Sequence, residues 1–184
     1  MKKVVVGIAG MPGAGKATFN EIARRKGYDV IVMGDEIREE TKRRGLELTP
    51  ENIGKIMLQL RKEKGQAVVA TRCILRIEKA KGNIVFVDGI RSLDEAKEFK
   101  KHLSNFILIA IHSSPKTRFQ RLFRRKRSDA PKGWETFLKR DLRELSVGLG
   151  SAIAMADYLI VNEGTKEEFK MKINDVLEAT LGNG

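Results

Sequence analysis

The sequence has one cysteine among its 184 residues and lacks any long uncharged stretch. A lone cysteine cannot form an internal disulfide framework or a cysteine-based zinc site, and it fits a reducing compartment. The uncharged runs at 4–15 and 145–156 reach only 12 residues, short of the roughly 20 that a membrane span needs. The chain passes from Lys2-Lys3 straight into a strand-like run ending in glycines, which is not the pattern of a signal peptide. We therefore expect a soluble, cytoplasmic protein with no membrane partner.

The chain also lacks internal repeats, low-complexity tracts and linkers rich in proline, glycine or serine. Hydrophobic residues make up 41% of the sequence, which excludes a disordered tail protein. Its length suits one domain of about 100–200 residues. These features predict a single domain over residues 1–184 and leave the oligomeric state open.

Acidic residues are scarce relative to basic ones, with 24 Asp and Glu against 36 Lys and Arg, a net charge of +12. Such an excess is typical of proteins that bind nucleic acid, an anionic membrane or a phosphorylated small molecule. The charge is unevenly distributed, because residues 116–143 carry +8 and residues 144–184 carry −4. The basic segment 116–143 is either a solvated surface or a lid that binds phosphate groups.

Five short apolar runs rich in β-branched residues predict strands buried on both faces. They are Val4–Ala9, Val30–Val32, Ile84–Val87, Phe106–Ile111 and Tyr158–Val161. Helical segments lie between them. Thr49-Pro50 predicts a helix start, with the helix running to about Lys64, and Ser114-Pro115 predicts another start.

Alternating strands and helices predict a three-layer α/β fold in which a five-stranded parallel sheet is covered on both sides. The gap between the second and third predicted strands is too long for one crossover helix. Residues 35–82 are therefore expected to form a helical insertion above the sheet, and the basic segment 116–143 is a candidate for a second projection.

A glycine-rich loop follows the first predicted strand and precedes a predicted helix. It reads Gly10-Met11-Pro12-Gly13-Ala14-Gly15-Lys16, which has the spacing of a Walker A phosphate-binding loop (P-loop). Its glycines allow backbone N–H groups to surround an anion, and the helix N-terminus adds a favourable dipole. Lys16 would reach the β- and γ-phosphates of ATP, which makes it a catalytic candidate and predicts ATP with Mg²⁺ as cofactors.

Ala17 stands directly after this lysine, where the usual loop has a magnesium-binding serine or threonine, and Thr18 follows. In this respect the loop resembles that of adenylate kinases, which reads G-x-P-G-x-G-K-x-T. The resemblance implies that Thr18 contacts the α-phosphate and that magnesium is held through water, with no direct ligand from the chain. The predicted nucleotide-binding residues of the loop are Gly10, Met11, Pro12, Gly13, Ala14, Gly15, Lys16, Ala17 and Thr18.

The segment Gly34-Asp35-Glu36-Ile37-Arg38 follows the second predicted strand. An aspartate at the carboxyl end of a strand beside a phosphate loop can orient a hydroxyl nucleophile, accept its proton or hold a metal-bound water. The segment resembles the acceptor-binding element of nucleoside monophosphate kinases and the aspartate after the second strand of dephospho-CoA kinases. The resemblance implies a catalytic Asp35, with Asp35 and Arg38 binding the acceptor. The alternative is that Asp35 only caps the next helix.

The third predicted strand leads into Val87-Asp88-Gly89-Ile90-Arg91. Asp88 is a Walker B-like carboxylate, suited to hold magnesium through water. The segment resembles the D-G-x-x-R element of adenylate kinases but is one residue shorter. The resemblance places Asp88 and Arg91 in the substrate site, with a surface arginine capping the next helix as the alternative for Arg91. Arg72 and Arg76 either face the acceptor site or lie in solvent.

Arginines recur at helical spacing in the basic segment. Arg118, Arg121 and Arg125 share one face of a predicted helix, and Arg140 and Arg143 lie one turn apart on the next. One arginine per turn suits gripping a polyphosphate, because guanidinium groups bind phosphate oxygens bidentately.

The C-terminal half resembles dephospho-CoA kinases in S-P-x-T-x-x-x-R, in Arg140-Asp141-x-Arg143-Glu144 and in the run from Ala156 to Gly164. The resemblance implies that Arg121 lies against the adenine and that the backbone of the Asn162–Gly164 loop edges it. It also implies that Arg125 clamps the transferring phosphate together with Arg140 or Arg143.

Residues 1–38 and 84–181 together resemble archaeal adenylate-kinase-related, dephospho-CoA-kinase-like proteins. The resemblance implies an ATP-dependent phosphotransferase acting on a small phosphorylated acceptor of the nucleoside monophosphate or dephospho-CoA type. Two alternatives stay open: an RNA- or ribosome-associated ATPase or assembly factor, motivated by the +12 charge, and a catalytically idle nucleotide sensor, motivated by Ala17. Nothing in 39–83 specifies the acceptor.

Overall fold

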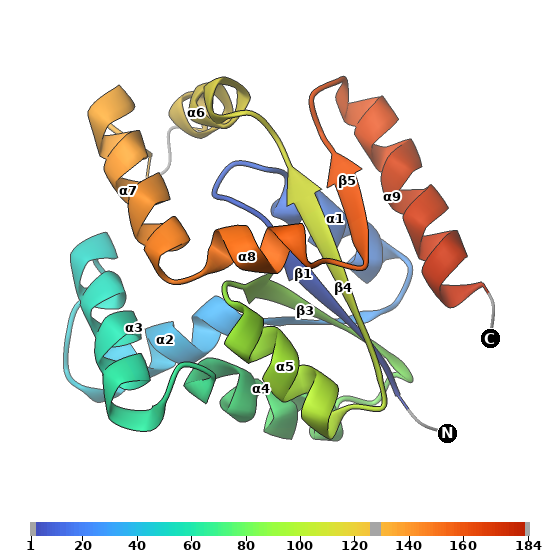
Figure 1. The fold of residues 1–184 in the computed structure, drawn as a ribbon, viewed down its shortest axis with the longest axis horizontal. Helices are drawn as coiled ribbons and strands as arrows, with labels where there is room; N and C mark the ends of the chain where they lie inside the picture. The colour runs from blue at the N-terminus through green and yellow to red at the C-terminus, as the bar shows by residue number, and fades with distance from the viewer. Residues whose placement is uncertain (1–2, 126–129, 183–184) are drawn as a thin grey trace.

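The computed structural model describes residues 3–125 and 130–182. Positions 126–129 of the predicted lid and the chain ends at 1–2 and 183–184 lie outside the described residues. The strands are β1 (Val4–Ala9), β2 (Asp29–Val32), β3 (Ile84–Ile90), β4 (Asn105–His112) and β5 (Tyr158–Val161). They form one parallel sheet in the order β2-β3-β1-β4-β5 (Figure 1), which confirms the predicted five-stranded α/β fold.

Helices connect the strands, and two of them start where the sequence predicts. The helices are α1 (Lys16–Arg25), α2 (Met33–Arg43), α3 (Pro50–Lys64), α4 (Val68–Lys79), α5 (Leu93–His102), α6 (Pro115–Arg124), α7 (Trp134–Ser146), α8 (Leu149–Ala154) and α9 (Lys166–Leu181). The Thr49 side chain caps α3 by accepting from Asn52 N–H at 3.2 Å, and the Ser114 side chain caps α6 by accepting from Thr117 N–H at 3.4 Å. Both caps stand directly before a proline in the first turn.

Two apolar cores lie on opposite faces of the sheet. Alternate residues of β1 divide between them, with Val5 in one core and Val6 in the other. Helices α1 and α9 cover one face, and α2, α3, α4, α5 and α8 contribute to the core on the other (Figure 1). Cys73 is fully buried in this second core, where burial raises the pKa of its thiol to about 12. The single cysteine is therefore a packing residue.

The predicted insertion between β2 and β3 consists of α2, α3 and α4, which are connected by an ion-pair network centred on the carboxylate of Glu40. Glu40 of α2 has a side chain only 3% exposed and accepts from Arg43 and Arg44 on its own helix. It also accepts from Arg72 of α4 at 3.1 Å, and Arg44 reaches Glu63 of α3 at 3.0 Å. Burial alone would raise the pKa of Glu40, but hydrogen bonds from the three arginines outweigh it and hold that pKa at about 2.

This pKa predicts acid sensitivity of the fold. Since the folded pKa of Glu40 lies below its ordinary value of 4.5, its stabilising contribution is present above pH 4.5 and is lost as the pH falls toward 2. Converted at 1.36 kcal/mol per pKa unit, the contribution is about 3 kcal/mol. Urea unfolding from pH 6 to pH 2 should show the difference between wild type and Glu40→Gln shrinking over this range.

A matched control is Glu21→Gln. Glu21 also pairs with an arginine one turn away, Arg25 at 2.6 Å, but both side chains are exposed. It should change the free energy of unfolding by less than about 0.5 kcal/mol at every pH. A Glu40→Gln variant as stable as the wild type at pH 6 would contradict the prediction.

Candidate functional site

The loop between β1 and α1 is built on three glycines with positive φ. Gly10, Gly13 and Gly15 have φ of 155°, 84° and 125°, values that residues with a Cβ rarely adopt. Ala14 N–H donates to the Met11 carbonyl at 3.1 Å and closes the turn. Helix α1 begins directly afterwards without a side-chain cap, so its amides before Thr18 are left for another acceptor. This is the geometry of an anion site at a helix N-terminus.

Lys16 folds back over the same loop. Its ammonium donates to the carbonyl oxygens of Gly10 and, at 3.4 Å, of Met11. Burial lowers the pKa of Lys16, the negative charge of Asp88 opposes this shift, and the nearby Arg91 adds to it. The ammonium is therefore held by neutral backbone acceptors, and a phosphate oxygen in their place would form a stronger, charge-assisted hydrogen bond.

Asn20 and Asp88 form a partly buried polar pair beside Lys16. Asn20 Nδ2 donates to Asp88 Oδ2 at 2.6 Å. The remaining oxygens, Asn20 Oδ1 and Asp88 Oδ1, are buried and have no hydrogen-bond partner within the described part of the chain. Because such oxygens are costly to leave unpaired, they indicate a ligand or ion that supplies positive charge or donors. Asn20 is not among the predicted site residues, although its place one turn after Lys16 on α1 was an available signal.

Asp35 lies inside α2, whose N-cap is Val32, so the alternative in which Asp35 caps this helix is wrong. Arg38 holds the Asp35 carboxylate through two donors, Nε at 3.1 Å and Nη2 at 2.5 Å. The register pairs Val32, the last residue of β2, with Asp88 near the end of β3, so Asp35 follows β2 at the level where Asp88 lies in β3. The two predicted acidic residues therefore belong to one edge of the sheet.

Arg91 follows β3 and turns toward α3 and α7. Its Nη1 lies 2.9 Å from Met57 Sδ and 3.4 Å from Glu144 Oε2. The alternative of a helix cap does not hold, since Ser92 caps α5 by accepting from Glu95 N–H at 3.2 Å. Arg91 thus connects the end of β3 to α3 of the insertion and to α7.

A small cavity of about 10 Å³ lies where α2, α3, α4 and the end of β3 meet. Gly34 and Arg91 line it together with apolar side chains such as Met33 and Met57. Arg61, which is only 5% exposed, also lines the cavity. Its Nη2 donates to Glu95 at 2.6 Å, whereas its Nε has no hydrogen-bond partner within the described residues. The cavity joins the two predicted acceptor elements, the one after β2 and the one after β3.

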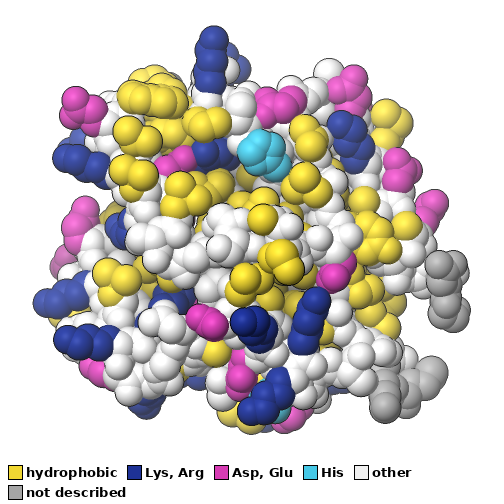
Figure 2. All heavy atoms as spheres, in the orientation of Figure 1, with side chains coloured by type: hydrophobic (Ala, Val, Ile, Leu, Met, Phe, Trp, Pro, Cys, Tyr) yellow, Lys and Arg dark blue, Asp and Glu magenta, His cyan; other side chains and the backbone are white. Residues whose placement is uncertain are grey.

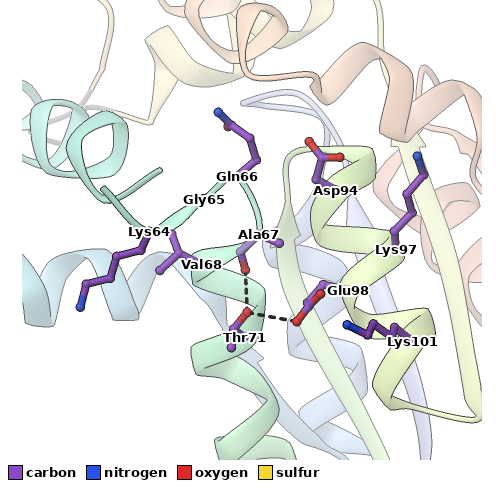
Figure 3. Close-up of a pocket in the computed structure, with 10 residues that line it drawn as sticks. All are labelled: Lys64, Gly65, Gln66, Ala67, Val68, Thr71, Asp94, Lys97, Glu98 and Lys101. Carbon is purple, nitrogen blue, oxygen red and sulfur yellow. Dashed lines mark hydrogen bonds between the residues drawn. The ribbon is translucent and has the colours of Figure 1, made fainter. Parts of the chain in front are cut away.

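A second cavity of about 590 Å³ opens between the start of α4 and α5 (Figure 3). Thr71 donates to Glu98 across it at 3.3 Å, and Lys97 and Lys101 stand on its α5 side. None of the predicted site residues lines this cavity. It is therefore separate from the phosphate loop.

Arg121 and Asn162 meet on the other side of the loop. Arg121 Nη2 donates to Asn162 Oδ1 at 3.2 Å, and its Nη1 donates to Ser113 Oγ at 3.0 Å. Asn162 Nδ2 in turn donates to the Ala14 carbonyl of the loop at 2.8 Å. The Asn162 side chain is therefore a support of the phosphate loop, a role beyond the backbone contact that the resemblance implies.

Arg118 is not available to grip a polyphosphate, which corrects the prediction that it shares this role with Arg121 and Arg125. The Arg118 residue is 3% exposed and forms a two-pronged ion pair with Asp141 of α7, at 2.8 and 2.5 Å. Arg125, the C-cap of α6, is exposed. The arginines predicted to share one helix face thus differ in burial, with Arg118 buried and Arg125 exposed.

Arg140 and Arg143 have different neighbours. Arg140 lies near the Lys16 ammonium, because its charge contributes, after burial and Arg91, to lowering the pKa of Lys16. Arg143 lies against α3, where a Cβ added to Gly54 would stand 3.2 Å from Arg143 Nη1. Of the two predicted clamp candidates, Arg140 therefore acts on the charge of Lys16, while Arg143 lies against the insertion.

Arg72 and Arg76 neither face the acceptor site nor extend freely into solvent. Both bind glutamates of α2, Arg72 pairing with Glu40 and Arg76 with Glu36 and Glu39. Their role is to hold α4 against α2.

Comparison with known proteins agrees with this architecture. A family model described as an AAA domain matches residues 9–137. A UPF0200 protein from Hyperthermus butylicus is 47% identical over 182 residues, covering 99% of this chain and 97% of the relative. The chain belongs to the UPF0200 family.

The fold of this UPF0200 protein resembles those of small-molecule kinases. Shikimate kinase from Acinetobacter baumannii in complex with shikimate superposes with a TM-score of 0.59 at 16% identity, covering 98% of this chain and 94% of that chain. A gluconokinase from Sinorhizobium meliloti superposes with a TM-score of 0.57 at 15% identity, with the same two coverages. At these identities the likeness establishes the fold alone, a P-loop NTPase fold of the small-molecule kinase type.

Nucleotide binding follows from the AAA-domain match together with the loop geometry of this UPF0200 protein. Residues 3–125 and 130–182 contain no helix that combines the length and apolar character needed to cross a membrane. Nor do these residues contain three or more His, Cys, Asp or Glu side chains grouped to hold a metal ion. The pair Asn20–Asp88 instead offers two buried oxygens, which fit a cation held through its water shell.

Proposed function

We propose that this protein is an ATP-dependent phosphotransferase that moves the γ-phosphate to a nucleotide-like small molecule. One observation carries the proposal: the phosphate loop with Lys16 after β1, Asp35 after β2 and Arg91 after β3 all lie at the carboxyl ends of neighbouring parallel strands. In open parallel sheets, ligands bind at the carboxyl ends of the strands. Two adjoining sites, one for a triphosphate and one for an acceptor, are what phosphoryl transfer requires.

On the donor side, the loop amides and Lys16 would bind the β- and γ-phosphates of ATP. Asp88 and Asn20 would hold Mg²⁺ through its waters, and Thr18 would contact the α-phosphate. The ion, when bound, would offset negative charge on the phosphate oxygens. Arg121 would lie against the adenine beside the Asn162–Gly164 loop, in addition to the support of the loop described above.

On the acceptor side, Asp35 would orient the attacking hydroxyl and accept its proton, while Arg38 and Arg91 would bind the acceptor's phosphate. Arg38 is paired with Asp35, and Arg91 is paired with Glu144. A more negative ligand would compete with these carboxylates for the guanidinium N–H groups. Arg140, near the Lys16 ammonium, and Arg125 would stabilise charge that develops on the transferring phosphate. Closure of the lid segment 116–143 would exclude water and suppress ATP hydrolysis.

The test is ADP release by the purified protein with ATP and Mg²⁺. Nucleoside monophosphates and dephospho-CoA are offered singly, with shikimate and gluconate as non-phosphorylated comparators. We expect one phosphorylated acceptor to raise ADP release at least about tenfold over the rate without acceptor. No stimulation by any compound of the panel would refute the proposed acceptor class.

A rival function, an RNA-associated ATPase, is motivated by the +12 charge. On the face shown in Figure 2, however, Lys and Arg side chains are interspersed with Asp and Glu instead of forming one continuous basic patch. Several arginines of the insertion are also paired with glutamates. RNA binding with a steep salt dependence, together with hydrolysis that needs no acceptor, would favour the rival.

A further inference from the structure

Arg118 makes direct contact with the phosphate loop from the lid segment. Its Nη1 donates to the Pro12 carbonyl at 3.2 Å, and its Nε donates to the Ser113 carbonyl at 3.0 Å. Ser113 follows β4, and Pro12 is the second residue after Gly10 in the loop. One guanidinium therefore spans the loop and the strand end beside it.

Helix α7 holds this guanidinium from two directions. Asp141 accepts from both Nη atoms along its edge, at 2.8 and 2.5 Å. One turn earlier on α7, the fully buried ring of Phe137 lies against its face, 5.1 Å from the ring centroid to Cζ. Both side chains of the ion pair are less than one-tenth exposed. Edge and face contacts together leave the guanidinium little freedom to rotate away from Pro12.

The loop also has no room to shift toward α6. A Cβ added to Gly13 would stand 2.8 Å from the Arg118 carbonyl oxygen and 3.1 Å from Leu122 Cγ. The loop backbone is thus packed against α6 at the residue that α7 holds. Docking of α7 and the conformation of the loop are therefore linked through one side chain.

We infer that Arg118 is a positioning residue that couples the docking of α7 to the phosphate-binding conformation of residues 10–16. Its Nη1 holds the Pro12 carbonyl, while Asp141 and Phe137 hold the guanidinium. The inference deepens the proposed function, on which its ligand rests: Arg118 links the lid segment to the phosphate loop, and the loop takes its binding shape only while α7 is docked. Arg121 and Arg125, on the same helix, remain the candidates for contact with nucleotide.

The experiment compares Asp141→Asn with Glu40→Gln. Both replace a buried carboxylate that bridges helices through arginine, but Glu40 lies in the insertion, away from the loop. Amide hydrogen exchange in peptides covering 10–19 is measured without ligand, because the Ala14, Thr18 and Phe19 amides there are hydrogen-bonded to loop carbonyls. Calorimetric titration with tripolyphosphate, which contacts the loop without an adenine, then measures the dissociation constant. Phe137→Leu, which keeps the ion pair, is the second variant in case Asp141→Asn does not fold.

We expect exchange of the 10–19 peptides to accelerate at least fivefold in Asp141→Asn and less in Phe137→Leu, while Glu40→Gln stays within twofold of wild type. Tripolyphosphate affinity should fall at least tenfold in Asp141→Asn and remain unchanged in Glu40→Gln. Unchanged loop exchange in both folded lid variants would overturn the inference, whatever the ligand data show. Accelerated exchange in a protein whose wild type binds no tripolyphosphate would support the coupling and refute the proposed function instead.

Discussion

Replacing Lys16 by alanine is expected to reduce acceptor-dependent ADP release at least about 100-fold and to weaken ATP binding. The ammonium is held by the Gly10 and Met11 carbonyls, so it is already placed over the loop. The alanine variant keeps the loop glycines but loses the one lysine charge that would neutralise the β- and γ-phosphates. Stopped assays of ADP release and calorimetric titration with ATP measure the two losses.

Lys3→Ala is the matched control for this experiment. Lys3 also donates its ammonium to backbone carbonyls, those of Ile77, Glu78 and Ala80 at 2.7, 3.0 and 2.6 Å. It stands at the opposite end of β1 from the loop. Its removal should lower the stability of the end of α4 and leave ADP release unchanged. Equal activity of Lys16→Ala and wild type would show that phosphate transfer does not use the loop.

The sheet and the phosphate loop were predictable because their signals are local. A strand buried on both faces must be apolar along its whole length, so short continuous apolar runs in the sequence predict β1 and β4. The loop can be predicted because backbone positions with positive φ favour glycine, and three glycines before a lysine at this spacing indicate a phosphate-binding loop. The starts of α3 and α6 are equally local, since a threonine or serine before a proline satisfies the first turn.

The partners of charged side chains were not predictable, because they depend on residues far apart in sequence. Arg118 and Arg121 stand one turn apart on α6, yet Arg118 binds Asp141 of α7 whereas Arg121 binds Asn162 after β5. Spacing along one helix gives both the same face but says nothing of what packs against each. Asn20 stands one turn after Lys16, which was a local signal for its face of α1, but its contact with Asp88 depends on the neighbouring β3.

Replacing Gly15 by alanine is expected to distort the phosphate loop, and to cost more stability than the same replacement at a glycine whose Cβ position is open. Gly15 has φ 125°, and a Cβ there would stand 2.5 Å from Asn162 Nδ2 and 2.8 Å from the Phe169 ring. The backbone strain of a residue with a Cβ at positive φ costs roughly 1–2 kcal/mol. The clash adds to this, because relieving it displaces Asn162 from the Ala14 carbonyl, so we expect a loss of about 3 kcal/mol or more in the free energy of unfolding.

Gly27→Ala separates strain from clash. Gly27 also has positive φ, 81°, but a Cβ there would meet nothing within 4 Å. It should therefore lose only the strain, roughly 1–2 kcal/mol, and bind ATP like the wild type. Urea unfolding and ATP titration of both variants test the comparison, with ATP affinity of Gly15→Ala expected to fall at least tenfold. If the two variants lost equal stability and both kept ATP affinity, the support of the loop by Asn162 would be irrelevant to binding, and the anion site would depend on glycine φ values alone.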